Sequence, residues 1–179
     1  MNVLNYKDAA YEKFVSKLNR RATPGVAGKK IEKTVSAIIA DVQKRGNAAV
    51  FEYTHRFDGL KLTAKSLFVS QAEIDEAYSL VDDDVKKAVA ISKRNIHSFA
   101  KRSLRKDWKA KNPEGVEVGE RFTPYDRVGV YVPGGKAPLV SSALMTAAFG
   151  QAAGVPEILA ATPAGANGKI NPALLYALV

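Results

Sequence analysis

Residues 127–145 read RVGVYVPGGKAPLVSSALM, and this stretch decides the fold. Its β-branched apolar run, residues 127–132, predicts a buried strand, and the Pro-Gly-Gly that follows predicts a tight loop. No charged residue occurs from Ala137 to Pro156, so residues 138–152 are expected to form a buried helix. Residues 157–161 predict a second strand. Two strands joined by a helix make a βαβ unit, so a parallel sheet is expected to start here.

The end of the chain continues this pattern. The loop TPAGANGK follows the second strand, and Asn171 before Pro172 is typical of a helix start. Two parallel strands alone would leave apolar side chains without cover. We therefore expect another copy of the chain to pack on the segment after about residue 127. The last-helix side chains that would need this cover are Leu174, Leu175 and Leu178.

The sequence before residue 127 is mostly helical by its periodicity. Ser70 and Glu73 have the spacing of a capping box at a helix start. The longest helix follows, and its expected apolar face is formed by Val85, Val89, Ile96, Phe99, Ala100, Leu104 and Trp108. The other expected helices cover residues 8–20, 31–46, 48–53 and 70–80. A connector is expected at 21–30, an extended segment at 60–69 and an edge or hairpin strand at 116–122.

The net charge of +9 comes from one stretch. Residues 86–111 hold ten Lys or Arg and one acidic residue, Asp107, and the remaining basic and acidic residues balance at 17 each. The excess charge therefore belongs mainly to the outer face of one helix. Such a face is either solvated, an interface with an acidic surface, or a contact for nucleic-acid phosphates. No nucleic-acid motif or aromatic interleaving accompanies it, so nucleic acid is not the expected partner.

Composition limits the class of protein further. The 179 residues suggest one domain and part of another, and the absence of cysteine excludes disulfides and thiolate chemistry. The N-terminal sequence resembles neither a signal peptide nor a membrane anchor, and polar residues within 137–156 argue against a membrane span. We expect a cytoplasmic protein without membrane contact.

The glycine loop does not match the nucleotide motifs that it suggests. The segment GVYVPGGK lacks the P-loop spacing, Ala137 stands where a hydroxyl residue would be needed, and no dinucleotide fingerprint is present. A strand that enters a glycine turn before a helix can direct backbone N–H groups at a ligand. It can equally be a tight turn that lets helix and strand pack closely. Both readings stay open on spacing alone.

Histidine chemistry has little support in the sequence. His55 and His97 are the only histidines, and neither has Asp, Glu or His neighbours at metal-ligand spacing. No Ser-His-Asp or Cys-His arrangement can be assembled. We therefore assign no catalytic and no metal-binding residue.

Four collinear segments resemble the histidinol dehydrogenase family. They are DVQKRGNAAVFEYTHRFDG at 41–59, RNIHSFAKRS at 94–103, the opening segment at 127–145, and AGVPEILAATPAGANGKINPALLYAL at 153–178. The resemblance covers essentially the whole chain, and its most specific part is YVPGG followed by APL. It implies a Rossmann-like α/β enzyme that oxidises L-histidinol through the aldehyde to L-histidine, the last steps of histidine biosynthesis. It further implies NAD and zinc as cofactors and a homodimer.

The resemblance also implies residue roles. In the family, the tyrosine of the YVPGG segment contacts the nicotinamide cofactor, and the matching residue is Tyr131. Gly134 and Gly135 would then let the backbone approach the cofactor. The family's zinc ligands and catalytic Glu-His pair have no counterpart here, so they are expected beyond the end of this chain.

The fold expected from these observations is an incomplete α/β, Rossmann-like fragment. Residues 1–126 would be the helix-rich part of a first Rossmann-like domain, and 127–179 the start of a second, cofactor-binding one. The fragment by itself is expected to be inactive. Two alternatives remain: a relative that oxidises another alcohol, such as a sulfonated diol, and a non-catalytic nucleic-acid-binding module that uses the basic helix 85–109.

Overall fold

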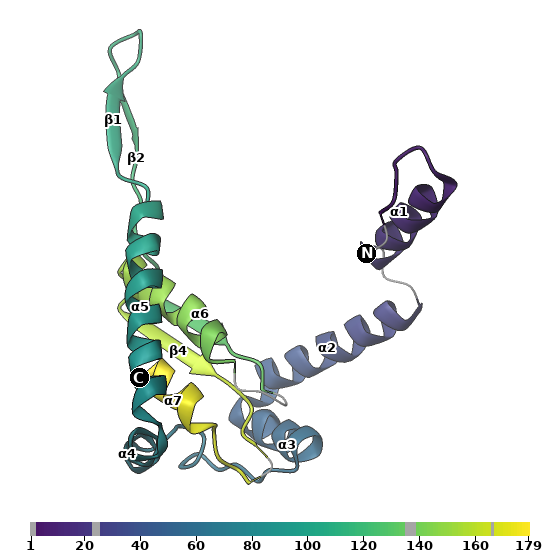
Figure 1. Cartoon of the computed structure of the whole chain (residues 1–179), viewed down its shortest axis with the longest axis vertical. Helices are drawn as coiled ribbons and strands as arrows, with labels where there is room; N and C mark the ends of the chain where they lie inside the picture. Colours follow the sequence, from purple (N-terminus) through teal and green to yellow (C-terminus); the bar gives the residue numbers. More distant parts are fainter. Residues whose placement is uncertain (1–2, 23–25, 135–138, 166) are drawn as a thin grey trace. The chain divides into compact units, whose positions relative to one another are not determined.

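The computed structural model describes residues 3–22, 26–134, 139–165 and 167–179. The chain divides into two compact units, Met1–His55 and Arg56–Val179 (Figure 1). The predicted domain boundary between residues 126 and 127 refers to the domains of a longer protein, and it stays a prediction. In this chain, elements from both sides of residue 126 pack together in the second unit.

The first unit is helical, as its periodicity predicts. It contains α1 (Ala9–Ala22), α2 (Val26–Arg45) and most of α3 (Asn47–Asp58). The predicted start of α2 at residue 31 is wrong, because the helix begins within the expected connector. Alanine and lysine favour a helix there and offset the loss of helix stability caused by Gly28. The predicted end of α3 at residue 53 is also wrong. No helix breaker occurs before Gly59, which has a φ of +72°.

Charged side chains join α2 to α3 across Gly46, which turns the chain with a φ of +59°. The Arg45 guanidinium bonds Asp41 and also Glu52, at 2.7 Å from Nη1 to Oε2. The Tyr53 hydroxyl donates to Asp41 Oδ2 over 3.0 Å. The Arg45 guanidinium lowers the pKa of the Asp41 carboxyl to about 2, and the bond to Asp41 raises the pKa of Tyr53. This network is called the corner network below.

The second unit contains the predicted parallel pair. Strands β3 (Arg127–Tyr131) and β4 (Glu157–Ala161) align with Arg127 opposite Glu157 and Tyr131 opposite Ala161. Helix α6 (Val140–Ala153) connects them and ends at Gly154, whose φ is +82°. The strand–helix–strand prediction is confirmed.

The predicted burial of β3 is wrong, because only one face of the pair is covered. A Cβ on Gly150 of α6 would lie 2.8 Å from Ile158 Cδ1, so α6 packs closely on the face that contains Ile158. Val128 and Val130 of β3 are half-buried, whereas Gly129, Tyr131 and Leu159 alternate with them and are exposed. A two-stranded sheet with a helix on one side buries only every second residue.

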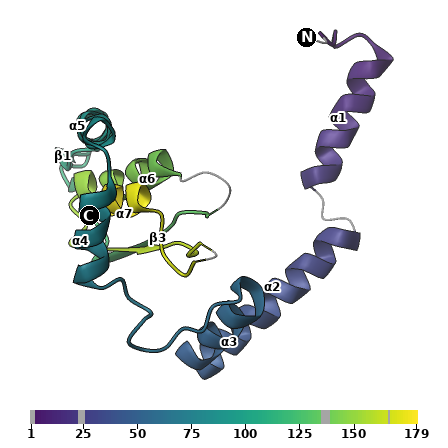
Figure 2. The same cartoon turned by 60° about the horizontal axis from the view of Figure 1, so that its bottom comes forward.

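Three further helices complete the core of the second unit: α4 (Gln71–Leu80), α5 (Asp83–Ser103) and α7 (Pro172–Leu178). Helix α5 packs on α6, while α7 packs on both α4 and α6. Figure 2 shows α6 and α7 on the same side of the parallel pair. The main buried cluster consists of Val89, Val132, Ala143, Leu144, Leu174 and Ala177.

This core corrects the prediction that a second copy must cover α7. Leu174 and Leu175 are buried within the single chain, and Leu178 packs at the edge of the cluster. Helices α4 and α6 provide this cover, which sequence periodicity could not place beside α7. A homo-oligomer stays a prediction.

The long basic helix is shorter than predicted. Helix α5 ends at Ser103, and Trp108 lies in a strand, β1 (Trp108–Lys111), that pairs antiparallel with β2 (Glu117–Glu120). Cross-strand bonds, Trp108 Nε1 to Glu120 Oε2 at 2.6 Å and Lys109 Nζ to Glu117 Oε1 at 2.7 Å, stabilise this hairpin. Phe99, assigned to the apolar face, is exposed.

Within the predicted extended segment 60–69, residues 64–68 form a turn and a bend, and no strand forms. The Thr63 amide donates to Ser66 Oγ over 2.9 Å, and the Ser66 amide donates back to the Thr63 carbonyl over 3.1 Å. Hydroxyl side chains compete in this way with strand pairing. Within the residues that the structure describes, no helix is both long and apolar enough to cross a membrane.

Candidate functional site

A cavity of about 800 Å³ lies in the second unit, next to the carboxyl ends of β3 and β4. Ligands of open α/β sheets bind at this end of the strands, because the loops that leave parallel strands gather there. The loop after β3, the loop after β4, helix α4 and the start of α7 form the walls. The lining residues are Glu73, Glu76, Ala77, Leu80, Pro133, Gly134, Pro163, Ala164, Gly165, Asn167, Lys169, Ile170, Asn171, Pro172, Leu174 and Leu175.

Helix α4 supplies the acidic wall. Its predicted capping box is confirmed: Ser70 accepts the Glu73 amide, and Glu73 Oε2 accepts the Ser70 amide over 2.8 Å. The Ser70 amide and hydroxyl lower the pKa of the Glu73 carboxyl, with a smaller contribution from Lys169. Glu73 is therefore ionised at neutral pH. Glu76 follows three residues later, so both carboxylates lie on one side of α4.

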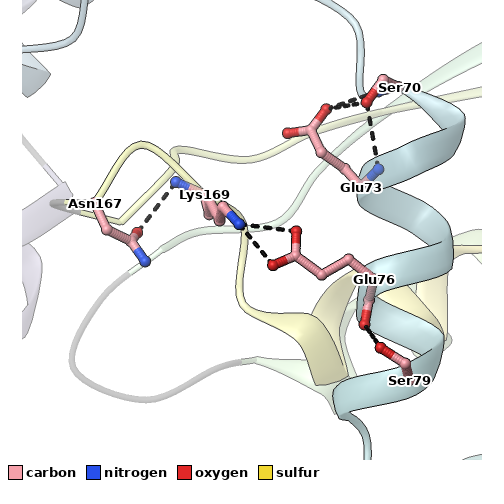
Figure 3. A network of polar contacts seen from close by, with 6 residues as sticks. All are labelled: Ser70, Glu73, Glu76, Ser79, Asn167 and Lys169. Atoms are coloured by element: carbon pink, nitrogen blue, oxygen red, sulfur yellow. Dashed lines mark hydrogen bonds and ion pairs between the residues drawn. The ribbon is translucent and has the colours of Figure 1, made fainter.

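The loop between β4 and α7 supplies the opposite wall and carries Lys169. Its ammonium group bonds both oxygens of the Glu76 carboxylate, at 2.6 and 2.8 Å (Figure 3). The Lys169 amide donates to Asn167 Oδ1 over 3.1 Å, and the Gly165 amide donates to the Lys169 carbonyl over 2.8 Å. Gly168 has a φ of +75°, which closes this turn.

The start of α7 lines the cavity, and it lies at Asn171 and Pro172, where the sequence predicts a helix start. Asn171 caps the helix by accepting the amides of Ala173 and Leu174 at 3.0 and 3.3 Å, and Pro172 occupies the first turn. The cap fixes where the helix begins. Leu174 and Leu175 then add to a lining that is mixed, with apolar side chains beside Glu73, Glu76, Asn167 and Lys169.

Gly134, a predicted cofactor residue, lines the cavity, but its surroundings favour packing. A Cβ at this position would lie 2.5 Å from Pro163 Cγ, so the loop after β3 can approach the loop after β4 only with glycine. The reading as a close-packing turn is thereby supported. A cofactor contact by its backbone stays a prediction.

The other two predicted cofactor residues are not part of the described cavity wall. Tyr131 is the last residue of β3, lies opposite Ala161 and is 66% exposed. It is not among the lining residues. Gly135 lies outside the described residues. Their predicted cofactor contacts stay predictions.

Sequence reasoning missed the charged pair of this site. Glu73 was assigned only a capping role, and neither Glu76 nor Lys169 was singled out. The Glu73–Glu76 spacing is a weak signal, since helices commonly carry acidic residues on one solvated side. Glu76 and Lys169 are 93 positions apart in the sequence, which leaves no local pattern to find.

The described residues contain no cluster of metal-binding side chains. Within the ranges 3–22, 26–134, 139–165 and 167–179, no three His, Cys, Asp or Glu side chains are placed to hold a metal ion. His55 ends the first unit on α3, and His97 lies on α5 in the second. These residues do not fit the zinc ion that the resemblance implies.

The basic helix is partly neutralised by its own first turn. Lys86 and Lys87 form ion pairs with Asp83 and Asp84 at 3.3 and 3.2 Å. Arg105 lies over the Phe122 ring, 5.8 Å from its centroid. The remaining cations of α5 are exposed: Lys93, Arg94, Lys101 and Arg102.

Comparisons with known proteins agree on one family. The family model described as histidinol dehydrogenase matches residues 21–179. The histidinol dehydrogenase of Symbiobacterium thermophilum is 42% identical over 164 residues, which span 92% of this chain and 37% of the relative. That of Rhizobium meliloti is 41% identical over 175 residues, or 97% of this chain and 39% of the relative.

A solved structure agrees with these sequences. The crystal structure of histidinol dehydrogenase from Elizabethkingia anophelis superposes with a TM-score of 0.77 at 33% identity, over 83% of this chain and 34% of that one. The chain belongs to the histidinol dehydrogenase family. It spans less than two fifths of the length of these relatives, so the prediction that it matches part of a family-length sequence is confirmed. The predicted incomplete α/β fold is confirmed as well.

Proposed function

We propose that the chain is part of a zinc- and NAD-dependent enzyme that oxidises L-histidinol through the aldehyde to L-histidine. Family membership is the observation that carries this proposal, and it implies an oxidoreductase of histidine biosynthesis. Each relative described above is named histidinol dehydrogenase, which favours histidinol over a sulfonated diol. A homodimer in the cytoplasm is part of the proposal.

The cavity at the carboxyl ends of β3 and β4 is the proposed cofactor site. Its volume of about 800 Å³ is in the range of small-molecule pockets. Ionised Glu73 can accept hydrogen bonds from sugar hydroxyls, and the Asn167 amide can both donate to and accept from a carboxamide. Its described lining has one cation, Lys169, which is paired with Glu76. The lining therefore suits the sugar and ring portions of NAD better than the diphosphate.

A bound NAD would supply the hydride acceptor for oxidation of the alcohol carbon. Residues of this chain would bind and orient it: the loop after β3 through Pro133 and Gly134, and the loop after β4 through Pro163. Tyr131 would contact the nicotinamide by resemblance alone. Zinc ligands are proposed in the part of the family sequence that this chain does not span, and no reaction step is assigned to the metal here.

Titration of the 179-residue chain with NAD tests the cofactor site. Saturable binding is expected, and Ala164→Phe should abolish it by placing a ring in the cavity. Ala110→Phe on the exposed strand β1 is the matched control and should leave binding unchanged. Tyr131→Ala should weaken binding if the carried-over contact exists. No binding by the unaltered chain, or equal binding by both phenylalanine variants, would overturn the assignment of this cavity.

The proposed substrate is tested separately, with NADH formation from L-histidinol as the measurement. The chain alone, supplied with zinc and NAD, is expected to give no turnover above background. Turnover by this chain would contradict the proposal that the catalytic residues lie outside it.

A further inference from the structure

The Glu76–Lys169 ion pair joins two walls of the cavity. Lys169 Nζ contacts both Glu76 carboxylate oxygens, at 2.6 and 2.8 Å, and the two residues are 93 positions apart (Figure 3). Glu76 belongs to α4, whereas Lys169 belongs to the loop between β4 and α7. Both line the cavity. The pair therefore spans from one wall to the other.

The loop between β4 and α7 is held at its start by packing and at its end by a helix cap, whereas an ion pair holds its middle. Pro163 lies against Gly134 at the start, and Asn171 caps α7 at the end. Between them, the backbone bonds at Gly165 and Gly168 close the turn only on itself. Within the described residues, the bond to Glu76 is the one ion pair that ties this turn to another element.

Helix α4 is a fixed base for such a contact. The capping box at Ser70 and Glu73 sets where the helix begins. Ala77, one position after Glu76, is buried at 3% exposure, and α4 packs against α7. Tyr78 stacks edge-on against Tyr176 of α7, with centroids 4.7 Å apart. The Glu76 carboxylate is thus presented from a packed helix, while Lys169 comes from a loop.

We propose that the Glu76–Lys169 pair is a latch that positions residues 163–165 and 167–170, between β4 and α7, as a cavity wall and so sets the cavity's affinity for its ligand. This inference rests on the proposed function for the identity of that ligand, NAD. Glu76 and Lys169 are positioning residues: they act on the ligand through the loop. With the latch open, Asn167 and Gly165 would no longer be held at the cavity, and the ligand would have to order them on binding.

The size of the effect follows from the exposure of the pair. Its side chains are 56% and 45% exposed, so water and salt screen the attraction. Loss of one exposed pair corresponds to a change of up to about fivefold in an equilibrium constant. Salt should weaken NAD binding to the unaltered chain more than to a variant that lacks the pair.

The experiment uses the full 179-residue chain and two readouts. Amide hydrogen exchange of Gly165, Gly168 and Lys169 reports the loop without any ligand, and NAD titration reports the cavity. Glu76→Gln should accelerate exchange at these amides and weaken NAD binding by up to about fivefold. The double variant Glu76→Lys with Lys169→Glu should restore both. Glu117→Gln is the matched control, because it removes an ion pair of similar exposure in the β1–β2 hairpin.

The two readouts separate this proposal from the cofactor assignment. Unchanged exchange at the three amides in Glu76→Gln would overturn the latch, whether or not NAD binds. Faster exchange with unchanged NAD affinity would overturn the link from the loop to the ligand. Failure of the unaltered chain to bind NAD would instead overturn the cofactor assignment of the cavity.

Discussion

The α2–α3 corner of the first unit and the core of the second unit are held together by opposite kinds of interaction. At the corner, exposed charged groups within twelve residues of one another bond across a glycine turn. In the core, buried apolar side chains come from positions as distant as Val89 and Ala177. Polar contacts between residues close in the sequence have a spacing that can be recognised in the sequence, but they stabilise the fold weakly and depend on pH. Long-range apolar packing is strong, and sequence does not reveal its partners.

The largest expected effect is in the core. Leu174→Ala removes a side chain that is 3% exposed and leaves a cavity among α4, α6 and α7. The free energy of unfolding should fall by about 3 kcal/mol. Urea unfolding followed by circular dichroism measures it. Leu80→Ala on α4, where the side chain is 62% exposed, is the control and should cost well under 1 kcal/mol. Equal losses of unfolding free energy in the two variants would show that buried and exposed leucines stabilise this unit equally, which would contradict the prediction.

A close backbone approach should come next in size. Gly134→Ala places a methyl group 2.5 Å from the Pro163 ring, which must shift. Overpacking of this kind costs about 1–3 kcal/mol. Gly129→Ala is the control, because no atom lies within 4 Å of a Cβ there. Pro163→Ala combined with Gly134→Ala should recover part of the loss. A neutral Gly134→Ala would show that the two strand loops are not packed as described.

The capping box of α4 is a polar contact between residues close in the sequence, and it lies in the second unit. It therefore allows polar and apolar contributions to stability to be compared within one unit. Ser70→Ala should cost about 1 kcal/mol. Ser79→Ala, whose hydroxyl bonds only the Glu76 carbonyl of the same helix, is the control. Because the folded chain lowers the Glu73 pKa below its ordinary value of 4.5, the contribution is present above that pH and is lost as pH falls below it. A Ser70→Ala effect that is independent of pH from 7 to 3 would contradict this.

The smallest expected effect concerns the corner network. The Asp41 pKa is lowered from 3.8 to about 2, so its stabilising contribution is complete above 3.8 and is lost as pH falls toward 2. Asp41→Asn should remove this acid dependence: it should lower stability above pH 3.8, where the contribution is present, and change it little near pH 2. The carboxyl titration of Asp41 by NMR is the direct measurement, and Glu32→Gln on α2 is the control. A titration midpoint at the ordinary value would show that the Arg45 contact does not persist in solution.

The sequence predicted the elements whose signals are local. The strand run at 127–132, the Ser70–Glu73 box and the Asn171–Pro172 start each specify structure within a few residues, and the structure confirms an element at each place. The parallel pairing also followed, because a strand, a helix and a second strand in order strongly favour that arrangement. Helix boundaries failed at the start of α2, where the helix contains Gly28, and at the end of α3, where no strong breaker occurs before Gly59.

The sequence by itself determined the family resemblance, the glycine loop after β3, and the order of helices and strands except for β1, which it assigned to the long helix. Only the tertiary structure decided that α4 and α7 pack together, that one face of the parallel pair stays exposed, and that Glu76 meets Lys169. Local signals arise from backbone propensity and caps, which act within about one helical turn. Contacts across 93 residues depend on how apolar faces pack, and many partners satisfy the same hydrophobic pattern. The cavity is formed entirely by such contacts, so its charged lining could not be found from sequence.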